Sequence, residues 1–193
     1  VLEATSDWHA AKMGELESDA RDRLAGARCK DSRIEVASVP PTQALIDASA
    51  RAATVVVGAR GHSLLSGVVL GSVSQHVTRH ASCPVIVARA PYHPDSDRIV
   101  VGVDGSTGSR KALEFAFEHA SRKKAPVTAI HAWRNSGRQE GLVEEIEAAE
   151  RILSEALAGF SDEYPDVKVM TEAIPIAPHR VLSDASQAAA LVV

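Results

Sequence analysis

Glycine and serine residues at one place in the chain have the spacing of a phosphate-binding loop. Gly58 ends the apolar run 55–57, Gly61 follows after two residues, and Gly71 with Ser72 follows after nine more, directly before a helical pattern. Glycine lets the backbone approach an anion and adopt a positive φ, and a helix N-terminus offers unpaired N–H groups and partial positive charge. The spacing differs from both the P-loop and the dinucleotide-fold patterns. It predicts a phosphate cradle without the lysine of a P-loop.

No catalytic group or metal site stands beside this cradle in the sequence. His76 and His80 lie one helical turn apart, which is a ligand spacing, but no third ligand accompanies them. We therefore interpret them as ordinary surface or partly buried histidines. The segment from Asp104 to Gly108 has the wrong order for an aspartic-protease signature, and no Gly-x-Ser-x-Gly elbow occurs. The sequence predicts neither catalytic residues nor metal ligands.

The bulk composition indicates a globular protein that binds neither nucleic acid nor membrane. Of the 193 residues, 45% are hydrophobic and 4% aromatic, which is typical of a parallel sheet under helices. The formal net charge is -4 and no dense Lys/Arg stripe occurs, so no nucleic-acid footprint is expected. No apolar run approaches membrane-spanning length. The two cysteines lie far apart, which favours a reducing, cytoplasmic setting.

Strand and helix patterns alternate along the chain and must position the cradle. Strands are predicted over 1–4, 33–39, 54–57, 85–88, 98–103, 126–133, 167–173 and 191–193. Helices are predicted over 8–27, over 43–53 with Thr42 as a cap, and from Ser72 to before Cys83. Further helices are predicted from after Ser106 to about Lys124, over 142–160 and over 178–189. Such alternation favours right-handed βαβ units and an open parallel sheet.

The chain contains an internal repeat. A shift of 137 positions lays Asp47-Ala48-Ser49 on Asp184-Ala185-Ser186 and Pro41 on Pro178. The repeat predicts two domains of one kind, 1–90 and 98–193, joined by the proline-containing linker 91–97. The first copy lacks an opening strand and helix, and the second lacks a closing strand, helix and strand. Either the residues belong to a longer tandem protein, which we prefer, or the two halves complement one another.

Three motifs resemble the universal stress protein family in a tandem, two-domain form. They are the cradle from Gly58 to Ser72, the strand end Val103-Asp104-Gly105-Ser106, and the closing strand Cys83-Pro84-Val85-Ile86-Val87. The resemblance covers nearly the whole chain apart from the linker. It implies two doubly wound α/β domains of the adenine nucleotide α-hydrolase type, with parallel strands in the order 3-2-1-4-5. It also implies an adenine-nucleotide site at the carboxyl ends of strands 1 and 4, where open α/β sheets generally bind ligands.

The resemblance also assigns roles to individual residues. Asp104 would contact the adenosine end, and the glycines would let the backbone approach ribose and phosphates. N–H and hydroxyl groups at the start of the next helix would bind phosphate, with Arg60 as an electrostatic helper. Ordinary loop turns for the glycines, and a turn or helix cap for Asp104, remain the alternatives. The assigned residues are Gly58, Arg60, Gly61, Gly71, Ser72, Val73, Ser74 and Asp104.

These features lead to three hypotheses about function. The first is a regulatory protein that binds ATP or another adenine nucleotide, with or without Mg²⁺, and hydrolyses it slowly or not at all, because no catalytic lysine, base or metal carboxylate is placed. It would act on a regulatory protein partner of unknown identity. The second is a dimerising scaffold that pairs through the edge strand 85–88, which would otherwise be an exposed template. The third is an ATP-hydrolysing enzyme.

Overall fold

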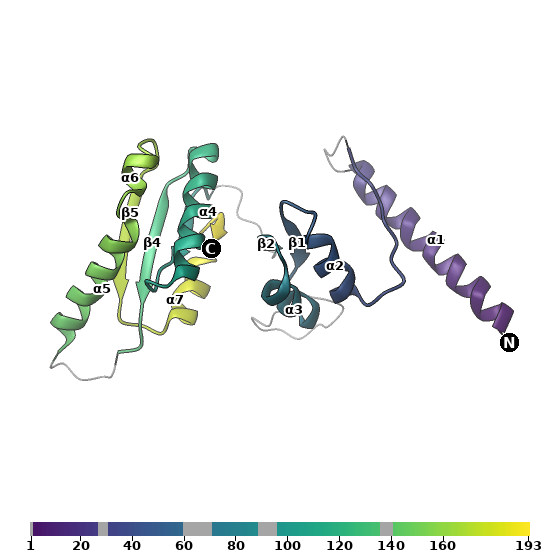
Figure 1. The fold of residues 1–193 in the computed structure, drawn as a ribbon, viewed down its shortest axis with the longest axis horizontal. Coiled ribbons are helices and arrows are strands. Elements are labelled where there is room, and N and C mark those ends of the chain that lie inside the picture. The colour runs from purple at the N-terminus through teal and green to yellow at the C-terminus, as the bar shows by residue number, and fades with distance from the viewer. Residues whose placement is uncertain (1, 27–30, 60–70, 89–95, 136–140) are drawn as a thin grey trace. The chain divides into compact units, whose positions relative to one another are not determined.

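The computed structural model describes residues 2–26, 31–59, 71–88, 96–135 and 141–193, with side chains described from residue 11 onward (Figure 1). The chain divides into two compact units, Val1–Ala90 and Pro91–Val193. In the described part of the chain, no helix is both long enough and apolar enough to cross a membrane.

The first unit contains a short parallel sheet with a small apolar core. Its elements are α1 (Leu2–Gly26), α2 (Pro41–Ser49), β1 (Val55–Gly58), α3 (Ser72–His80) and β2 (Val85–Ala88). Strands β1 and β2 pair in parallel, from Val55 with Val85 to Gly58 with Ala88, because α3 carries the chain back between them. Val55 and Val57 point into a core with Val77 of α3. The intervening Val56 lies on the other face and is 62% exposed.

Three predictions in the first unit are wrong. Residues 2–4 belong to α1 and not to a strand, since no turn residue separates them from the helix pattern that follows. Segment 33–39 alternates in hydrophobicity but forms no strand; its Val36 and Val39 are exposed, and it pairs with no described strand. Thr42 is not a cap, because α2 already starts at Pro41 and its N-cap position, Pro40, makes no side-chain bond.

The second unit is a four-stranded parallel sheet covered on both faces. Its strands lie in the order β5-β4-β3-β6, which corresponds to the order 3-2-1-4 expected from the sequence. Its elements are β3 (Ile99–Gly102), α4 (Thr107–Lys123), β4 (Val127–Ala132), α5 (Leu142–Leu157), α6 (Phe160–Glu163), β5 (Val169–Ile174), α7 (Pro178–Ala185) and β6 (Leu191–Val192). The predicted helix 142–160 is interrupted because Gly159 adopts a φ of 87°.

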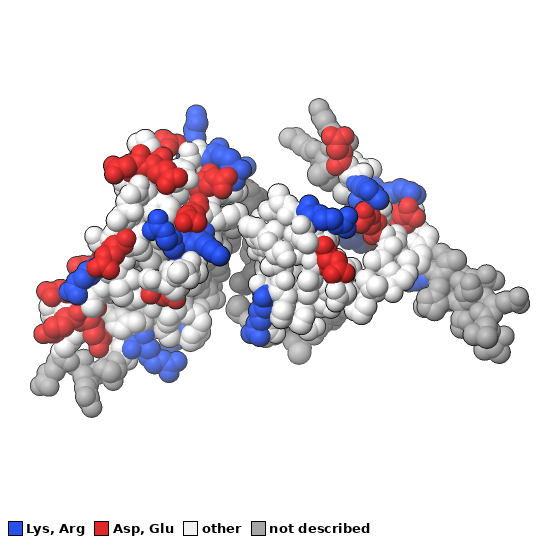
Figure 2. Space-filling model, in the orientation of Figure 1, with Lys and Arg blue, Asp and Glu red and all other residues white. Residues whose placement is uncertain are grey.

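Alternating strand residues in this unit serve two separate cores. Ile99 and Val101 pack with α4 and α5, whereas Val100 packs with Val181 of α7 on the opposite face. The predicted doubly wound α/β architecture is thus confirmed. Acidic side chains gather over the outer side of α5, where Glu144, Glu147 and Glu150 are exposed (Figure 2).

The two units repeat local details as well as element order. Helices α2 and α7 start at the equivalent prolines, Pro41 and Pro178. Near their ends, the hydroxyl groups of Ser49 and Ser186 each donate to the carbonyl oxygen three residues earlier, at 2.6 Å in both cases. The equivalent serines therefore close the two helices in the same way.

Candidate phosphate-binding site

The cradle predicted from the glycines lies between the carboxyl end of β1 and the start of α3. Gly58 is the last residue of β1, and the next amide, of Ala59, donates to the carbonyl oxygen of Ala88 at 2.9 Å. The carbonyl oxygen of Ala59 in turn accepts from the amide of Gly71 at 2.9 Å. These bonds hold the strand end against the start of α3. Arg60 and Gly61, which also belong to the predicted cradle, lie outside the described residues.

Ser74 fixes α3 to the end of β1. Its hydroxyl donates to the carbonyl oxygen of Gly58 at 2.6 Å, and the residue is only 5% exposed. One turn later, Val77 is fully buried in the core below the strand. The hydroxyl proton of Ser74 is therefore used within the protein, which leaves its backbone N–H as the donor that faces the cradle.

The first turn of α3 presents backbone donors without acceptors. Gly71 is the N-cap, with no side-chain cap bond, and its carbonyl oxygen accepts from Gln75 at 2.9 Å. Within the described residues, nothing accepts from the amides of Ser72, Val73 and Ser74. The first turn carries no acidic residue to satisfy the positive end of the helix. An anion at this position would receive up to three N–H bonds.

The glycines act here through their lack of a side chain and not through a positive φ. Gly71 has φ -60° and ψ 152°, and Gly58 is absent from the described residues with positive φ. Neither position therefore requires the left-handed backbone that glycine can adopt. Without a Cβ, both glycines would let an anion approach the backbone closely.

Asp104 forms the turn that follows β3 in the second unit, whereas Gly58 and the α3 residues belong to the first. Its Oδ1 accepts from the amide of Ser106 at 2.9 Å across Gly105, whose φ is 79°. Ser106 then caps α4 by accepting from the amide of Ser109 at 3.1 Å. Hydrogen bonds from the hydroxyl and backbone of Ser106 hold the pKa of Asp104 below its ordinary value. A turn-forming role for this carboxylate is therefore present in the structure.

The histidine pair on α3 is arranged by mutual contact. The rings of His76 and His80 stack with centroids 4.2 Å apart, and Nδ1 of His80 lies 2.8 Å from the carbonyl oxygen of His76. Among the side chains that the structure describes, no three His, Cys, Asp or Glu residues gather as a metal site would require.

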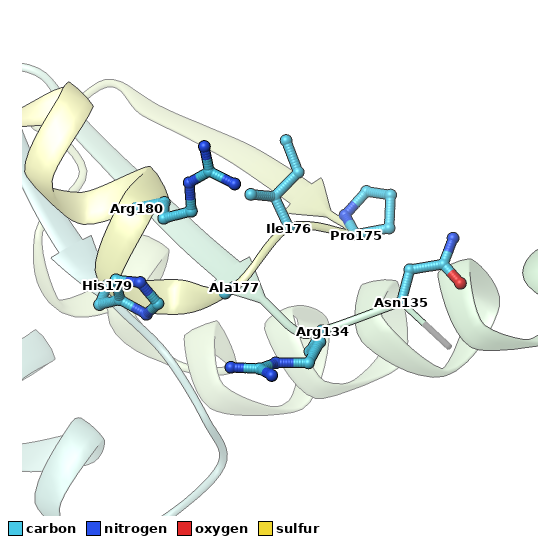
Figure 3. A pocket seen from close by; sticks show the side chains of 7 residues that line it. All are labelled: Arg134, Asn135, Pro175, Ile176, Ala177, His179 and Arg180. Atoms are coloured by element: carbon cyan, nitrogen blue, oxygen red, sulfur yellow. The ribbon is translucent and has the colours of Figure 1, made fainter. Parts of the chain in front are cut away.

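A cavity of about 480 Å³ in the second unit was not singled out by the sequence patterns. It lies in the second unit, at the ends of β4 and β5 (Figure 3). Its lining residues are Arg134, Asn135, Pro175, Ile176, Ala177, His179 and Arg180. The position of the arginines in the sequence could have indicated this cavity, because they follow two strands whose carboxyl ends lie at one edge of the sheet.

The second unit, a parallel sheet covered by helices on both faces, defines the class of doubly wound α/β proteins. Comparison with known sequences identifies the family. Residues 2–89 and 96–193 each match the model of the Universal stress protein family. The chain therefore belongs to the universal stress protein family and contains two copies of its domain, as the three sequence motifs had indicated.

Individual relatives agree with this assignment. The chain is 37% identical over 177 residues to a universal stress protein of Mycobacterium tuberculosis, which covers 88% of this chain and 59% of that protein. A relative from Mycolicibacterium smegmatis is 36% identical over 201 residues, covering 100% of this chain and 68% of the relative. This chain thus spans 59% of the length of the Mycobacterium tuberculosis relative.

A solved structure supports the fold. The universal stress protein of Archaeoglobus fulgidus superposes with a TM-score of 0.63 at 24% identity, over 94% of this chain and 63% of that one. The open α/β arrangement of the described units is thus that of a known family member.

Proposed function

We propose that this chain is the nucleotide-binding part of a cytoplasmic regulatory protein, and that its ligand is an adenine nucleotide, ATP above all. The observation that carries the proposal is the first turn of α3. Three backbone amides there have no acceptor among the described residues, and Ser74 and Gly71 fix them beside the end of β1. Such an arrangement binds phosphate oxygens.

The proposed site holds phosphates better than it cleaves them. In the described part of the cradle, neither a lysine nor a carboxylate lies in the first turn of α3, so nothing there activates water or holds Mg²⁺. Any Mg²⁺ would arrive with the nucleotide. Arg60 and Gly61 complete the proposed cradle, and Asp104 is the proposed adenosine contact of the second copy. Binding would change a partner's affinity by favouring one loop state over another.

Calorimetric titration of the whole chain with ATP tests the proposal. We expect saturable binding, and at least a tenfold loss of affinity in Ser72→Asp, because the new carboxylate repels phosphate at the exposed first position of α3. The same carboxylate favours the helix itself, since acidic groups stabilise helix N-termini. A loss of affinity is therefore separable from a loss of folding.

Thr78→Asp is the matched control, since it introduces the same charge at an exposed position near the other end of α3. Its affinity for ATP should stay near that of the parent chain. Absence of binding at millimolar ATP, or equal losses in both variants, would overturn the proposal. Release of phosphate well above background would instead favour an ATP-hydrolysing enzyme.

A second candidate function, assembly through β2, is favoured by the position of that strand. Among the described strands β2 pairs only with β1, so its outer edge is unpaired. Val85 and Val87 pack on the core of the first unit, so lysine there would damage folding. Ile86 lies on the opposite face and is the better site.

If β2 forms the contact between copies, Ile86→Lys should dissociate the assembly in sedimentation velocity. Val56→Lys is the control, because Val56 lies opposite Ile86 on the same face of the neighbouring strand β1. An assembly that survives Ile86→Lys, or one that both variants break equally, excludes β2 as the contact.

A further inference from the structure

Three nitrogen-rich side chains border the cavity at the ends of β4 and β5. Arg134 follows β4, and His179 and Arg180 belong to the first turn of α7. Figure 3 shows the guanidinium groups of Arg134 and Arg180 on different sides of the space that His179 borders. None of the seven lining residues is acidic, although the chain as a whole carries a net charge of -4. The cavity is thus a local concentration of positive charge.

Comparison of the two repeats shows that the side chain of Arg180 makes no described ion pair with the carboxylate one turn later in its helix. Its equivalent in the first unit, Gln43 of α2, donates from Nε2 to Oδ1 of Asp47 one turn later, at 2.7 Å. Asp184 stands at the same spacing from Arg180, yet among the described ion pairs neither Arg180 nor Arg134 takes part. Other helical arginines, such as Arg21 and Arg122, do pair with a carboxylate one turn away.

The start of α7 adds to this positive field. Its N-cap, Ala177, provides no side-chain cap, and Pro178 at the next position has no N–H. The carbonyl oxygen of Ala177 accepts from the backbone amide of Arg180 at 3.0 Å, and no described acceptor bonds the amide of His179. That amide and the positive end of the helix dipole therefore lie at the border of the cavity, which His179 lines.

We propose that this cavity is a second anion site, which takes the phosphate monoester group of a small molecule. A guanidinium group can bind two phosphate oxygens through two parallel N–H bonds, and the ring and amide of His179 would supply further donors. The cavity is open to solvent, with Arg134, His179 and Arg180 exposed around it, and its volume of about 480 Å³ exceeds what a bare phosphate needs. The exposed Ile176, at 48%, and Pro175 offer apolar surface for the organic part.

This site is independent of the cradle at α3 and of ATP binding there. It uses side chains that the first copy lacks, since Thr42 and Gln43 stand where the second copy has His179 and Arg180. The two copies of the domain would thus carry different ligand chemistry. One copy would bind phosphates through backbone amides and the other through cationic side chains.

The test is a titration of the isotope-labelled whole chain with glycerol 3-phosphate, with inorganic phosphate and with glycerol, followed through backbone amide shifts. We expect saturable shifts at Arg134, His179 and Arg180, tighter binding of glycerol 3-phosphate than of inorganic phosphate, and no response to glycerol. Arg180→Gln should weaken binding about tenfold, the effect of losing a charge-assisted hydrogen bond pair. Folding of α7 should survive, because α2 carries Gln43 at the equivalent position.

Arg151→Gln supplies the control, because it removes the same charge from an exposed position on α5. Equal losses in both variants would show nonspecific attraction and overturn the site. Equal affinity for the two phosphates would overturn the assignment of a monoester. Shifts confined to residues 72–74, or none at millimolar ligand, would likewise contradict the proposal.

Discussion

Replacing Ser74 by alanine should loosen the junction between β1 and α3. The hydroxyl of Ser74 bonds the carbonyl oxygen of Gly58 at 2.6 Å and is almost fully buried, so water cannot easily replace it. The lost bond costs about 1 kcal/mol, and the carbonyl left without this donor costs about 1 kcal/mol more. A total of about 2 kcal/mol raises the local opening equilibrium about 30-fold.

Amide hydrogen exchange followed by mass spectrometry measures this opening directly. Peptides covering β1 and α3 should exchange about 30-fold faster in Ser74→Ala, while peptides from the second unit serve as an internal reference. Ser72→Ala is the matched control, because Ser72 is exposed and no described residue bonds its hydroxyl. Unchanged exchange in β1 and α3, or the same acceleration in Ser72→Ala, would refute the stabilising role of the bond from Ser74 to Gly58.

Three further predictions concern the second unit. Thr128→Val should raise its free energy of unfolding by about 1 kcal/mol in urea, because Oγ1 of Thr128 is buried and lacks a hydrogen-bond partner among the described residues. Gly105→Ala should lower it by about 1 kcal/mol through strain alone, since φ is 79° and the nearest side-chain atom is an ordinary 3.5 Å away. Burial, helped by Arg122 and Lys123, lowers the pKa of His119. The unfolded chain then binds the proton first, so stability should fall as pH drops through the ordinary histidine range, and His119→Gln should flatten that slope.

The sheet could be predicted because its signals are local. Apolar β-branched runs such as 99–101 need burial on both faces, and alternation with helices fixes parallel pairing. Segment 33–39 also had a local signal, an alternation of hydrophobic residues, but it pairs with no described strand. Hydrophobic alternation specifies a face, whereas a strand also needs a partner.

The candidate sites could be predicted only in part, because their decisive contacts are not local in sequence. The bond from Ser74 to Gly58 spans 16 residues, whereas the family resemblance had assigned that hydroxyl to phosphate. Gln43 and Arg180 each have an aspartate four residues later, Asp47 and Asp184. Among the described interactions, only Gln43 bonds its aspartate. Side-chain direction depends on surroundings that a repeat pattern does not contain.

Amide shift mapping with ATP on the whole chain tests the central claim most directly. If the first turn of α3 holds the phosphates, the largest saturable shifts should occur at the amides of Ser72, Val73 and Ser74 and should weaken in Ser72→Asp. Shifts at millimolar ATP that spare these three amides, or no shifts at all, would contradict the assignment of the cradle as a nucleotide site.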